Sequence, residues 1–370
     1  MQIETALDAK TSTLVSSIVL SKSGFMNTAE PTQLTEEMPF QVMKRTWQPV
    51  ALSSELVAGK IVSYKLFDLD LVVTRLPHGI LVADDTCPHK GARLSRGQVC
   101  DGELQCAYHG WRFNKDGDCT NIPSLINPNP DKLRLSHLRT YRTQERYGMI
   151  WVQVETDEKT QLPKVPEFEN PAWTFLLGPP TVFKSGFRRE IENYLDMTHF
   201  AFAHAKTLGK AASPTMPEME ITLHPDGFQM DAPFPALKTP HEQPGKLQSA
   251  HHRRQRCHLP NFTTIRQSFA DGDERVLVHI PSPNTLTECT CFWALAVSPG
   301  FDGPPPPDQL AFAISVLDED RIMCENQVPA EVPINPSRGG WGVLVTPGDT
   351  LANTFQKCFR KYLLEQMPNP

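Results

Sequence analysis

The chain has 370 residues, of which 39% are hydrophobic and 21% are charged. This length exceeds what one ordinary core needs, so we expect two folded domains, and the composition is that of a soluble globular protein rather than a disordered one. The net charge of -6 argues against a nucleic-acid-binding protein, and no apolar run is long enough for a membrane span. The nine cysteines show no disulfide framework and the first ten residues lack the basic start of a secretory signal, so we expect a cytoplasmic protein.

The first domain is predicted at residues 39–158, after an extension. Residues 1–38 mix Ser, Thr and Glu around one short apolar piece, and we interpret them as loosely ordered or as a short docking helix. The following segment favours short strands, which indicates an all-β domain. We predict turns at 68–70 and 77–79, a strand at 111–113 with a hairpin turn at 114–117, and a last strand at 147–152.

Two Cys-His pairs form the most specific motif of the chain. Cys87-Pro88-His89 is followed, after sixteen residues, by Cys106-Ala107-Tyr108-His109, and both pairs fall on loops between predicted strands. Two thiolates and two imidazoles suit a [2Fe–2S] cluster of the Rieske type, in which the cysteines bind one iron and the histidines the other. Glycines beside both pairs would allow backbone amides to approach the cluster sulfurs.

A structural zinc site uses the same donor set and is the alternative interpretation of these four residues. Zinc fingers, however, usually pair two cysteines in one half of the motif and two histidines in the other. Here each half mixes one Cys with one His. The pattern therefore favours the iron–sulfur cluster.

The rest of the chain, which we place at 159–370, has a different pattern, and the boundary falls within a charged and proline-containing linker at 155–171. It combines helical segments with strand-like runs, which is typical of an α+β domain with a sheet capped by helices. We interpret the polar stretch 206–260 as a loop that is functional or disordered. Its basic run, 251–256, is either a solvated surface stretch or a surface that attracts an acidic substrate or an acidic reductase. The other predicted elements are a helical segment at 187–205, strands at 261–269, 275–279, 289–297 and 311–316, a turn at 304–307 and a final helix at 350–365.

The helical segment contains a second set of metal-binding side chains, Asp196, His199 and His204. Two imidazoles and one carboxylate on one face of a metal are typical of non-haem Fe(II) sites that use O2. His199 and His204 are five residues apart, and a regular helix would splay their rings by about 140°. We therefore expect the helix to bend, to bulge or to end near Phe202 if both rings bind one metal. The alternative is an ordinary half-buried helix whose His and Asp side chains only form hydrogen bonds.

The spacing leaves the third ligand of this metal open. Asp196 lies three residues before His199 and shares its helix face, which favours it as a ligand. The other candidate is Asp320, in an acidic cluster before a short apolar run. By itself, that cluster is more typical of a solvated turn before a helix.

Together, these motifs resemble the oxygenase component of Rieske non-haem iron oxygenases. The most similar group contains the vanillate, dicamba and methylxanthine demethylases and the saxitoxin-type hydroxylases. The resemblance extends from about Trp47 to about Pro329, and it implies an N-terminal all-β Rieske domain followed by a helix-grip (START-like) catalytic domain with an antiparallel sheet. The motifs that carry it are CPHKGA at 87–92, CAYHGW at 106–111, ERYG at 145–148, Glu192-Asn193 before Asp196, His199 and His204, and Glu319-Asp320 with Gln327.

The resemblance also assigns roles to individual residues. It implies that His199, His204 and Asp320 bind the mononuclear iron. Asp196 is then a bridging carboxylate, which hydrogen-bonds a histidine of that site and reaches His109 of a neighbouring subunit. Family members form head-to-tail homotrimers, in which electrons pass between neighbouring chains.

The implied activity is that of a monooxygenase with a Rieske cluster, mononuclear Fe(II) and O2. It would hydroxylate a C–H bond of a small cyclic or heterocyclic molecule, or remove an N- or O-methyl group as formaldehyde. The sequence has no Gly-rich dinucleotide fingerprint and no plant-type ferredoxin motif. The electrons of NAD(P)H would therefore come through a separate reductase with flavin and a plant-type ferredoxin group, or through a ferredoxin.

Two other functions fit part of the pattern. An electron carrier with a Rieske cluster and an unrelated second domain would need no mononuclear iron. A membrane-associated chlorophyll-pathway oxygenase would carry a C-terminal span and a C-terminal CxxC motif, and this sequence shows neither.

Overall fold

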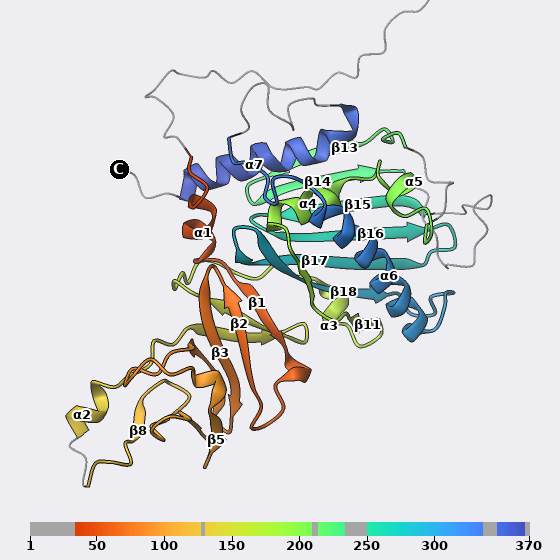
Figure 1. The fold of residues 1–370 in the computed structure, drawn as a ribbon. Helices are drawn as coiled ribbons and strands as arrows, with labels where there is room; N and C mark the ends of the chain where they lie inside the picture. Colours follow the sequence, from red (N-terminus) through yellow and green to blue (C-terminus); the bar gives the residue numbers. More distant parts are fainter. Residues whose placement is uncertain (1–33, 127–129, 209–213, 234–249, 336–345, 367–370) are drawn as a thin grey trace, which may run out of the picture. The chain divides into compact units, whose positions relative to one another are not determined.

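The computed structural model describes residues 34–126, 130–208, 214–233, 250–335 and 346–366. Most of the predicted N-terminal extension and parts of the predicted polar loop lie outside these ranges. The described residues form small antiparallel sheets in the N-terminal half and one large antiparallel sheet with helices in the C-terminal half (Figure 1). The expected α+β class is confirmed.

Short strands and tight turns build the N-terminal half. Its strands are β1 (Gln48–Leu52), β2 (Ile61–Leu66), β3 (Leu69–Leu76), β4 (Gly79–Asp84), β5 (Gln98–Cys100), β6 (Glu103–Gln105), β7 (Arg112–Phe113), β8 (Cys119–Asn121), β9 (Arg142–Arg146) and β10 (Met149–Gln153). Its helical elements are α1 (Met38–Met43), α2 (Pro130–Arg134) and the 3-10 turns η1 (Ser53–Glu55) and η2 (Leu94–Arg96). The strands pair as β1-β10-β9, β2-β3-β4 and β5-β6-β7-β8.

The turns of this half agree with the prediction in one case and differ in the other. The turn between β3 and β4 lies at Pro77 and His78, as expected. The turn predicted at 68–70 lies earlier, because Phe67 and Asp68 both adopt left-handed backbone, with φ of 52° and 63°, and β3 already begins at Leu69. Two successive left-handed residues are typical of a tight hairpin between β2 and β3.

The C-terminal half is organised around the large sheet. Its elements are α3 (Pro166–Glu169), β11 (Thr174–Leu177), β12 (Thr181–Phe183), α4 (Phe187–Leu195), α5 (Phe200–Ala203), β13 (Glu220–His224), β14 (Gly227–Ala232), β15 (Ala250–His258), β16 (Phe262–Phe269), β17 (Glu274–Thr285), β18 (Glu288–Val297), α6 (Pro306–Glu325), η4 (Pro347–Asp349) and α7 (Thr350–Gln366). Within the described residues the strand order is β11-β18-β17-β16-β15-β14-β13, with β12 also pairing with β18.

Two predictions for this half were wrong. The strand expected at 311–316 lies inside the long helix α6, whose buried residues Gln309, Leu317, Asp320 and Cys324 recur at helical intervals. The stretch 206–260, interpreted as a loop, contains β13, β14 and β15 in its described parts. In β15 the residues at 253, 255 and 257 are buried while the polar residues between them are more exposed, so its basic run alternates between the two faces of a strand.

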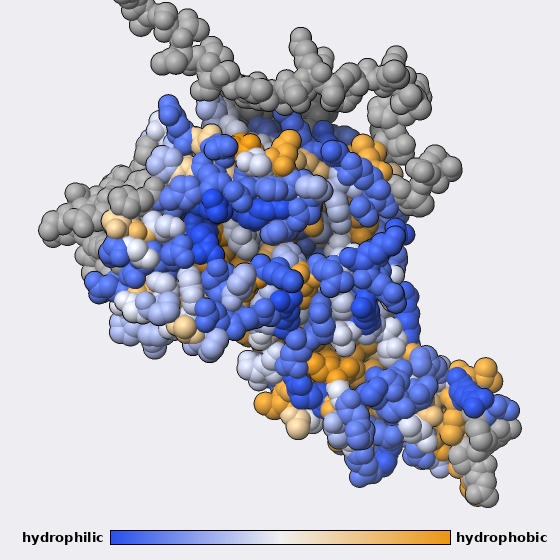
Figure 2. All heavy atoms as spheres, turned by 180° about the vertical axis from the view of Figure 1, so that it is seen from behind, coloured by the Kyte–Doolittle hydropathy of each residue, from blue (hydrophilic) through white to orange (hydrophobic). Residues whose placement is uncertain are grey.

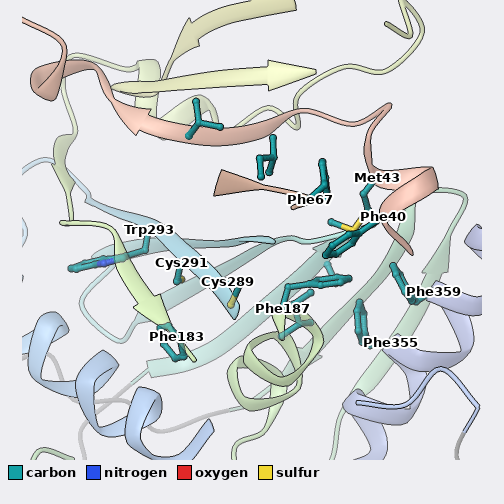
Figure 3. Packing of buried hydrophobic residues seen from close by; sticks show 14 of the residues in the cluster. Phe40, Met43, Phe67, Phe183, Phe187, Cys289, Cys291, Trp293, Phe355 and Phe359 are labelled. Carbon is teal, nitrogen blue, oxygen red and sulfur yellow. The ribbon is translucent and has the colours of Figure 1, made fainter. Parts of the chain in front are cut away.

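The two faces of the large sheet have different partners. One face packs on the N-terminal half, in a cluster that joins Trp151 of β10 and Trp47 to Val278 and Phe292. The other face meets α4, which also contacts α6 and α7. Figure 3 shows this second core, where Phe187 of α4 lies beside Phe359 of α7, with ring centroids 5.9 Å apart. Helix α4, which leads into the predicted iron site, is therefore anchored in the core at its beginning.

On the face in Figure 2, hydrophilic residues dominate, and hydrophobic ones gather in separate patches. Among the described residues, the helices are too short or too polar to cross a membrane.

Candidate metal centres

The two Cys-His pairs lie on loops with the same backbone conformation. In each loop, the cysteine amide donates a hydrogen bond to the carbonyl five residues later, and the cysteine carbonyl accepts one from the glycine four residues later. The four bonds are Cys87 N to Ala92 O (2.8 Å), Gly91 N to Cys87 O (2.9 Å), Cys106 N to Trp111 O (2.9 Å) and Gly110 N to Cys106 O (3.1 Å). Both glycines adopt left-handed backbone, with φ of 73° and 70°, which residues with a Cβ rarely do. The loops thus hold their two cysteines in equivalent backbone positions.

The donors of these loops separate into a sulfur pair and an imidazole pair. Cys87 and Cys106 are each 2% exposed. Burial raises the pKa of the Cys87 thiol to about 11, and the neighbouring Cys106 side chain raises it further. The rings of His89 and His109 lie with their centroids 4.5 Å apart. Among the described residues, no three of these four donors have ligand atoms within 4.8 Å of one another, so they are too far apart for one tetrahedral zinc.

His89 supplies a test of whether an iron–sulfur cluster fits. Its Nδ1 is buried and has no hydrogen-bond partner, which is costly for a ring nitrogen unless it binds a ligand. Trp111 stacks on the same ring, with centroids 4.4 Å apart and an interplanar angle of 7°. Burial, and then the charge of His109, lower the pKa of His89, which favours the neutral imidazole that binds metals. The residues present fit a two-iron cluster.

The second candidate centre brings together His199, His204 and Asp320. His199 Nε2 and His204 Nε2 are 3.2 Å apart, and Asp320 Oδ1 lies 3.3 Å from the first and 3.0 Å from the second. Asp320 Oδ1 is nevertheless buried without a well-directed hydrogen bond. Three donor atoms that converge at this range, without hydrogen-bond geometry between the carboxylate and the rings, fit two imidazoles and one carboxylate around a metal.

Electrostatics at this centre favour a cation. Burial opposes the ionisation of Asp320, but its contacts with His199 and His204 outweigh burial and hold its pKa well below the usual range. Burial likewise disfavours a charged His199, yet Asp196 and Asp320 raise the pKa of His199 to about 9. The carboxylates therefore create a site of negative potential around the two rings.

A break in the helix allows His199 and His204, which are five residues apart, to face each other. Helix α4 ends at Leu195, and Asp196 has extended backbone, with φ -74° and ψ 138°. His199 then precedes the short helix α5, and His204 follows it. The expected break is confirmed, although it lies before His199 and not near Phe202.

Asp196 lies behind His199 and outside the three converging donors. Its Oδ1 accepts hydrogen bonds from the Thr198 amide (2.6 Å) and hydroxyl (2.8 Å). Its Oδ2 lies 3.4 Å from His199 Nδ1, and 32% of the Asp196 side chain is exposed. Spacing alone favoured Asp196 as a ligand, whereas the geometry groups Asp320 with the two rings.

Sequence reasoning gave no role to several polar residues near this centre. Glu319 Oε2 lies 2.9 Å from His204 Nδ1, and the sequence offered only its position beside Asp320 as a signal. A further buried group consists of Glu190, His279 and Cys291. His279 Nδ1 and Glu190 Oε1 are 3.0 Å apart, and the Cys291 thiol lies 3.4 Å from the same oxygen, whereas Glu190 Oε2 is buried without a hydrogen-bond partner. His279 and Cys291 occupy inward positions of the mostly apolar strands β17 and β18, whereas Glu190 lies on α4.

The basic run of β15 is largely neutralised on its outer face. Arg254 and His252 both contact Asp231, and Arg256 and His258 both contact Asp226. These pairs support the solvated-surface interpretation for the outward residues. The buried Arg253 is the exception, because its side chain lies on the inner face, over the ring of Phe200.

Comparison with known proteins covers both candidate centres. The family model of the Rieske [2Fe-2S] domain matches residues 46–142, and that of the vanillate O-demethylase oxygenase C-terminal domain matches residues 183–364. Methylxanthine N3-demethylase NdmB of Pseudomonas putida is 29% identical over 307 residues, which cover 78% of this chain and 83% of the relative.

Solved structures support the same fold. The structure of NdmA of Pseudomonas putida CBB5 with caffeine superimposes with a TM-score of 0.75 at 24% identity, over 89% of this chain and 93% of that chain. Dicamba monooxygenase bound to dicamba gives a TM-score of 0.72 at 22% identity, over 87% of this chain and 98% of that chain. At these identities, the structures establish the shared architecture only.

Proposed function

Because the chain belongs to the Rieske non-haem iron oxygenases, we propose that it is the oxygenase component of a multicomponent monooxygenase. Membership makes it an oxidoreductase whose cofactors are a Rieske [2Fe–2S] cluster and a mononuclear non-haem iron, with O2 as cosubstrate. The observation that carries the proposal is the convergence of His199, His204 and Asp320, which an electron carrier would not need.

Each centre has its own ligands in this proposal. Cys87 and Cys106 hold one iron of the cluster, and His89 and His109 hold the other. His199, His204 and Asp320 hold the mononuclear iron. When bound, the cluster supplies single electrons and the mononuclear iron supplies the activation of O2. The proposed division into a Rieske domain at 39–158 and a catalytic domain at 159–370 places one centre in each domain.

Asp196 is the proposed link between the centres of neighbouring chains. Its Oδ2 lies 3.4 Å from Nδ1 of His199, beyond a well-directed hydrogen bond, on the side of the ring away from Nε2, which the proposal assigns to the metal. The exposed part of the carboxylate is free to meet His109 of the next copy, because His109 is also exposed. Such a head-to-tail contact closes into a homotrimer and lets electrons cross between subunits.

The reaction balances with an external reductant. A methyl group, O2, two electrons and two protons yield a hydroxymethyl group and water, and the hydroxymethyl group on nitrogen or oxygen then leaves as formaldehyde. A methyl or ring carbon bound only to carbon would keep the hydroxyl group. The electrons come from NAD(P)H through a separate reductase that carries flavin and a plant-type ferredoxin group, or through a ferredoxin. We place the enzyme in the cytoplasm, with no nucleic-acid or membrane partner.

The substrate proposed for first tests is a small N-methylated heterocycle. The name of NdmB records a methylxanthine as the substrate of that relative, and the family model that matches the C-terminal half is named after an O-demethylase. An O-methylated aromatic ring is therefore the second class to test.

Turnover with a generic reductase tests the proposal. Purified protein should contain about three iron atoms per chain, and formaldehyde should appear with at least one N- or O-methylated ring compound in a panel that includes unmethylated analogues as controls. Hydroxylation of an unmethylated analogue would identify the hydroxylase branch of the proposal. About two iron atoms per chain, with no product from any compound, would show an electron carrier instead.

A further inference from the structure

His204 is the more enclosed of the two histidines at the mononuclear centre. Its side chain is 1% exposed, against 17% for His199. Its Nε2 lies 3.0 Å from Asp320 Oδ1, and its Nδ1 lies 2.9 Å from Glu319 Oε2. A histidine that donates its Nδ1 proton to a carboxylate keeps a lone pair on Nε2, so the bond to Glu319 sets which nitrogen can bind metal.

Glu319 is itself fixed from the other side. The hydroxyl of Thr207 donates a 2.6 Å hydrogen bond to the same Oε2 that contacts His204. The Thr207 amide also bonds the His204 carbonyl at 3.2 Å, so the segment after α5 folds back on the histidine. The carboxylate thus has two donors at fixed positions, which restricts its rotation.

The partners of the two histidines differ. One oxygen of Asp196, Oδ1, accepts hydrogen bonds from Thr198. The other, Oδ2, lies 3.4 Å from His199 Nδ1, which has no well-directed hydrogen bond. Glu319 holds His204 at 2.9 Å and is 18% exposed. Only Asp196 among these two acids is open enough to reach another subunit, so Glu319 needs a different explanation.

We propose that Glu319 is a positioning residue of the mononuclear site, whose carboxylate fixes the ring of His204 with Nε2 directed at the metal, and that Thr207 fixes Glu319 in turn. This inference rests on the proposed iron ligands His199, His204 and Asp320. Helix α6 supplies both the ligand Asp320 and its neighbour Glu319. Loss of the carboxylate therefore leaves the ligand count unchanged but frees the His204 ring.

The variants that test this role are Glu319→Ala, Glu319→Gln and Thr207→Val. Holoenzyme is exposed to increasing EDTA, and the iron that remains in each chain is counted, with the Rieske absorbance as an internal standard. Glu319→Ala should lose the mononuclear iron at an EDTA concentration about 10- to 100-fold lower than the wild type. Removal of such hydrogen-bonding partners of metal ligands typically weakens metal binding by this factor. Glu319→Gln keeps an acceptor oxygen and should recover most of the difference, and Thr207→Val should give a smaller loss than Glu319→Ala.

Asp318→Asn is the matched control. Asp318 lies on the same helix, its side chain is 55% exposed, and it pairs with Arg321 at 2.6 Å. Its neutralisation changes the charge of α6 as Glu319→Gln does, but it leaves His204 untouched, so iron retention should equal that of the wild type. Melting after complete removal of the mononuclear iron separates positioning from general stability, because Glu319→Ala and the wild type should then unfold at the same temperature.

Three outcomes would overturn the positioning role. They are wild-type iron retention in Glu319→Ala, an equal loss in Asp318→Asn, and a lower melting temperature of iron-depleted Glu319→Ala that accounts for the whole effect. Failure of the proposed function looks different. A wild-type protein that held only the cluster iron would overturn both proposals, whereas normal iron retention in both the wild type and Glu319→Ala would overturn the positioning role alone.

Discussion

The two metal-binding regions of this chain are built in opposite ways. The Cys-His loops use one continuous stretch of sequence, and the same pair of backbone hydrogen bonds forms around each cysteine. The mononuclear site joins a helix break at 196–204 to Asp320 on α6, more than a hundred residues later. Local backbone conformation determines the first site, and tertiary packing determines the second. Substitutions should therefore damage the two regions through different mechanisms.

The largest effect should come from Asp320→Ala. It removes one of the three proposed metal ligands and should weaken retention of the mononuclear iron and turnover by at least about 100-fold, because the loss of residues that only support a ligand already costs up to about that much. Because the Cys-His loops depend on local structure, the visible absorbance of the Rieske cluster should remain. If metal analysis found full occupancy of the mononuclear iron in this variant, another residue would have to be the third ligand. The contrast between a local cluster site and a mononuclear site built by tertiary packing would then fail.

Asp196→Asn tests the proposed role of Asp196 as the link between the two centres. The amide keeps the size of the side chain but loses the charge that lies 3.4 Å from His199 Nδ1 and that faces the neighbouring chain in the proposed trimer. Reductase-supported turnover should fall about 10- to 100-fold while both metals stay bound, as iron analysis and the Rieske spectrum can verify. Turnover near the wild-type rate would show that the regions communicate by another route.

Gly91→Ala tests how strongly the first region depends on backbone conformation. Gly91 has φ of 73°, and an added Cβ would meet nothing within 4 Å, so only the left-handed backbone opposes alanine. The expected loss is about 1–2 kcal/mol in the free energy of unfolding, together with a weaker Rieske absorbance.

Gly272→Ala provides the matched control for that loop. Gly272 has φ of 93° and equally open space, and it lies in the turn between β16 and β17. It should lower the free energy of unfolding by a similar amount and leave the cluster spectrum unchanged. Equal spectral losses in both variants, compared by denaturant unfolding and absorbance, would contradict a local origin.

The smallest predicted effect is a pH dependence of the free energy of unfolding that arises from Glu331, a largely buried acid beside α4. Burial raises the pKa of Glu331 to about 7, although the neighbouring Arg188 of α4 acts in the opposite direction. Since the folded state favours the neutral acid, the stabilisation is complete below the unfolded pKa near 4.5 and is lost as pH rises through about 7. The free energy of unfolding should fall by about 1 kcal/mol between roughly pH 6 and pH 8.

Glu331→Gln should flatten this pH profile, because the amide does not titrate. Denaturant unfolding at several pH values measures both curves. A wild-type profile that stays flat, or a slope that persists in Glu331→Gln, would assign the pH dependence to other groups.

The same contrast explains what could be predicted from sequence. The Cys-His loops and the need for a break between His199 and His204 follow from spacing, which is a local property. Helix α6 was partly misread because a six-residue apolar window hides the helical recurrence of Leu317, Asp320 and Cys324. The contact of Glu319 with His204 depends on how α5 packs on α6, and spacing along the chain contains no information on that.

The pairing of His89 with Trp111 gives the cluster loops a polarity. Trp111 covers one face of His89 at 4.4 Å, whereas His109 is exposed beside Tyr108, which is itself 66% exposed. One histidine of the proposed cluster site is therefore covered on one face by a tryptophan, and the other is open to solvent. We expect an electron-transfer partner to approach these loops on the side of His109.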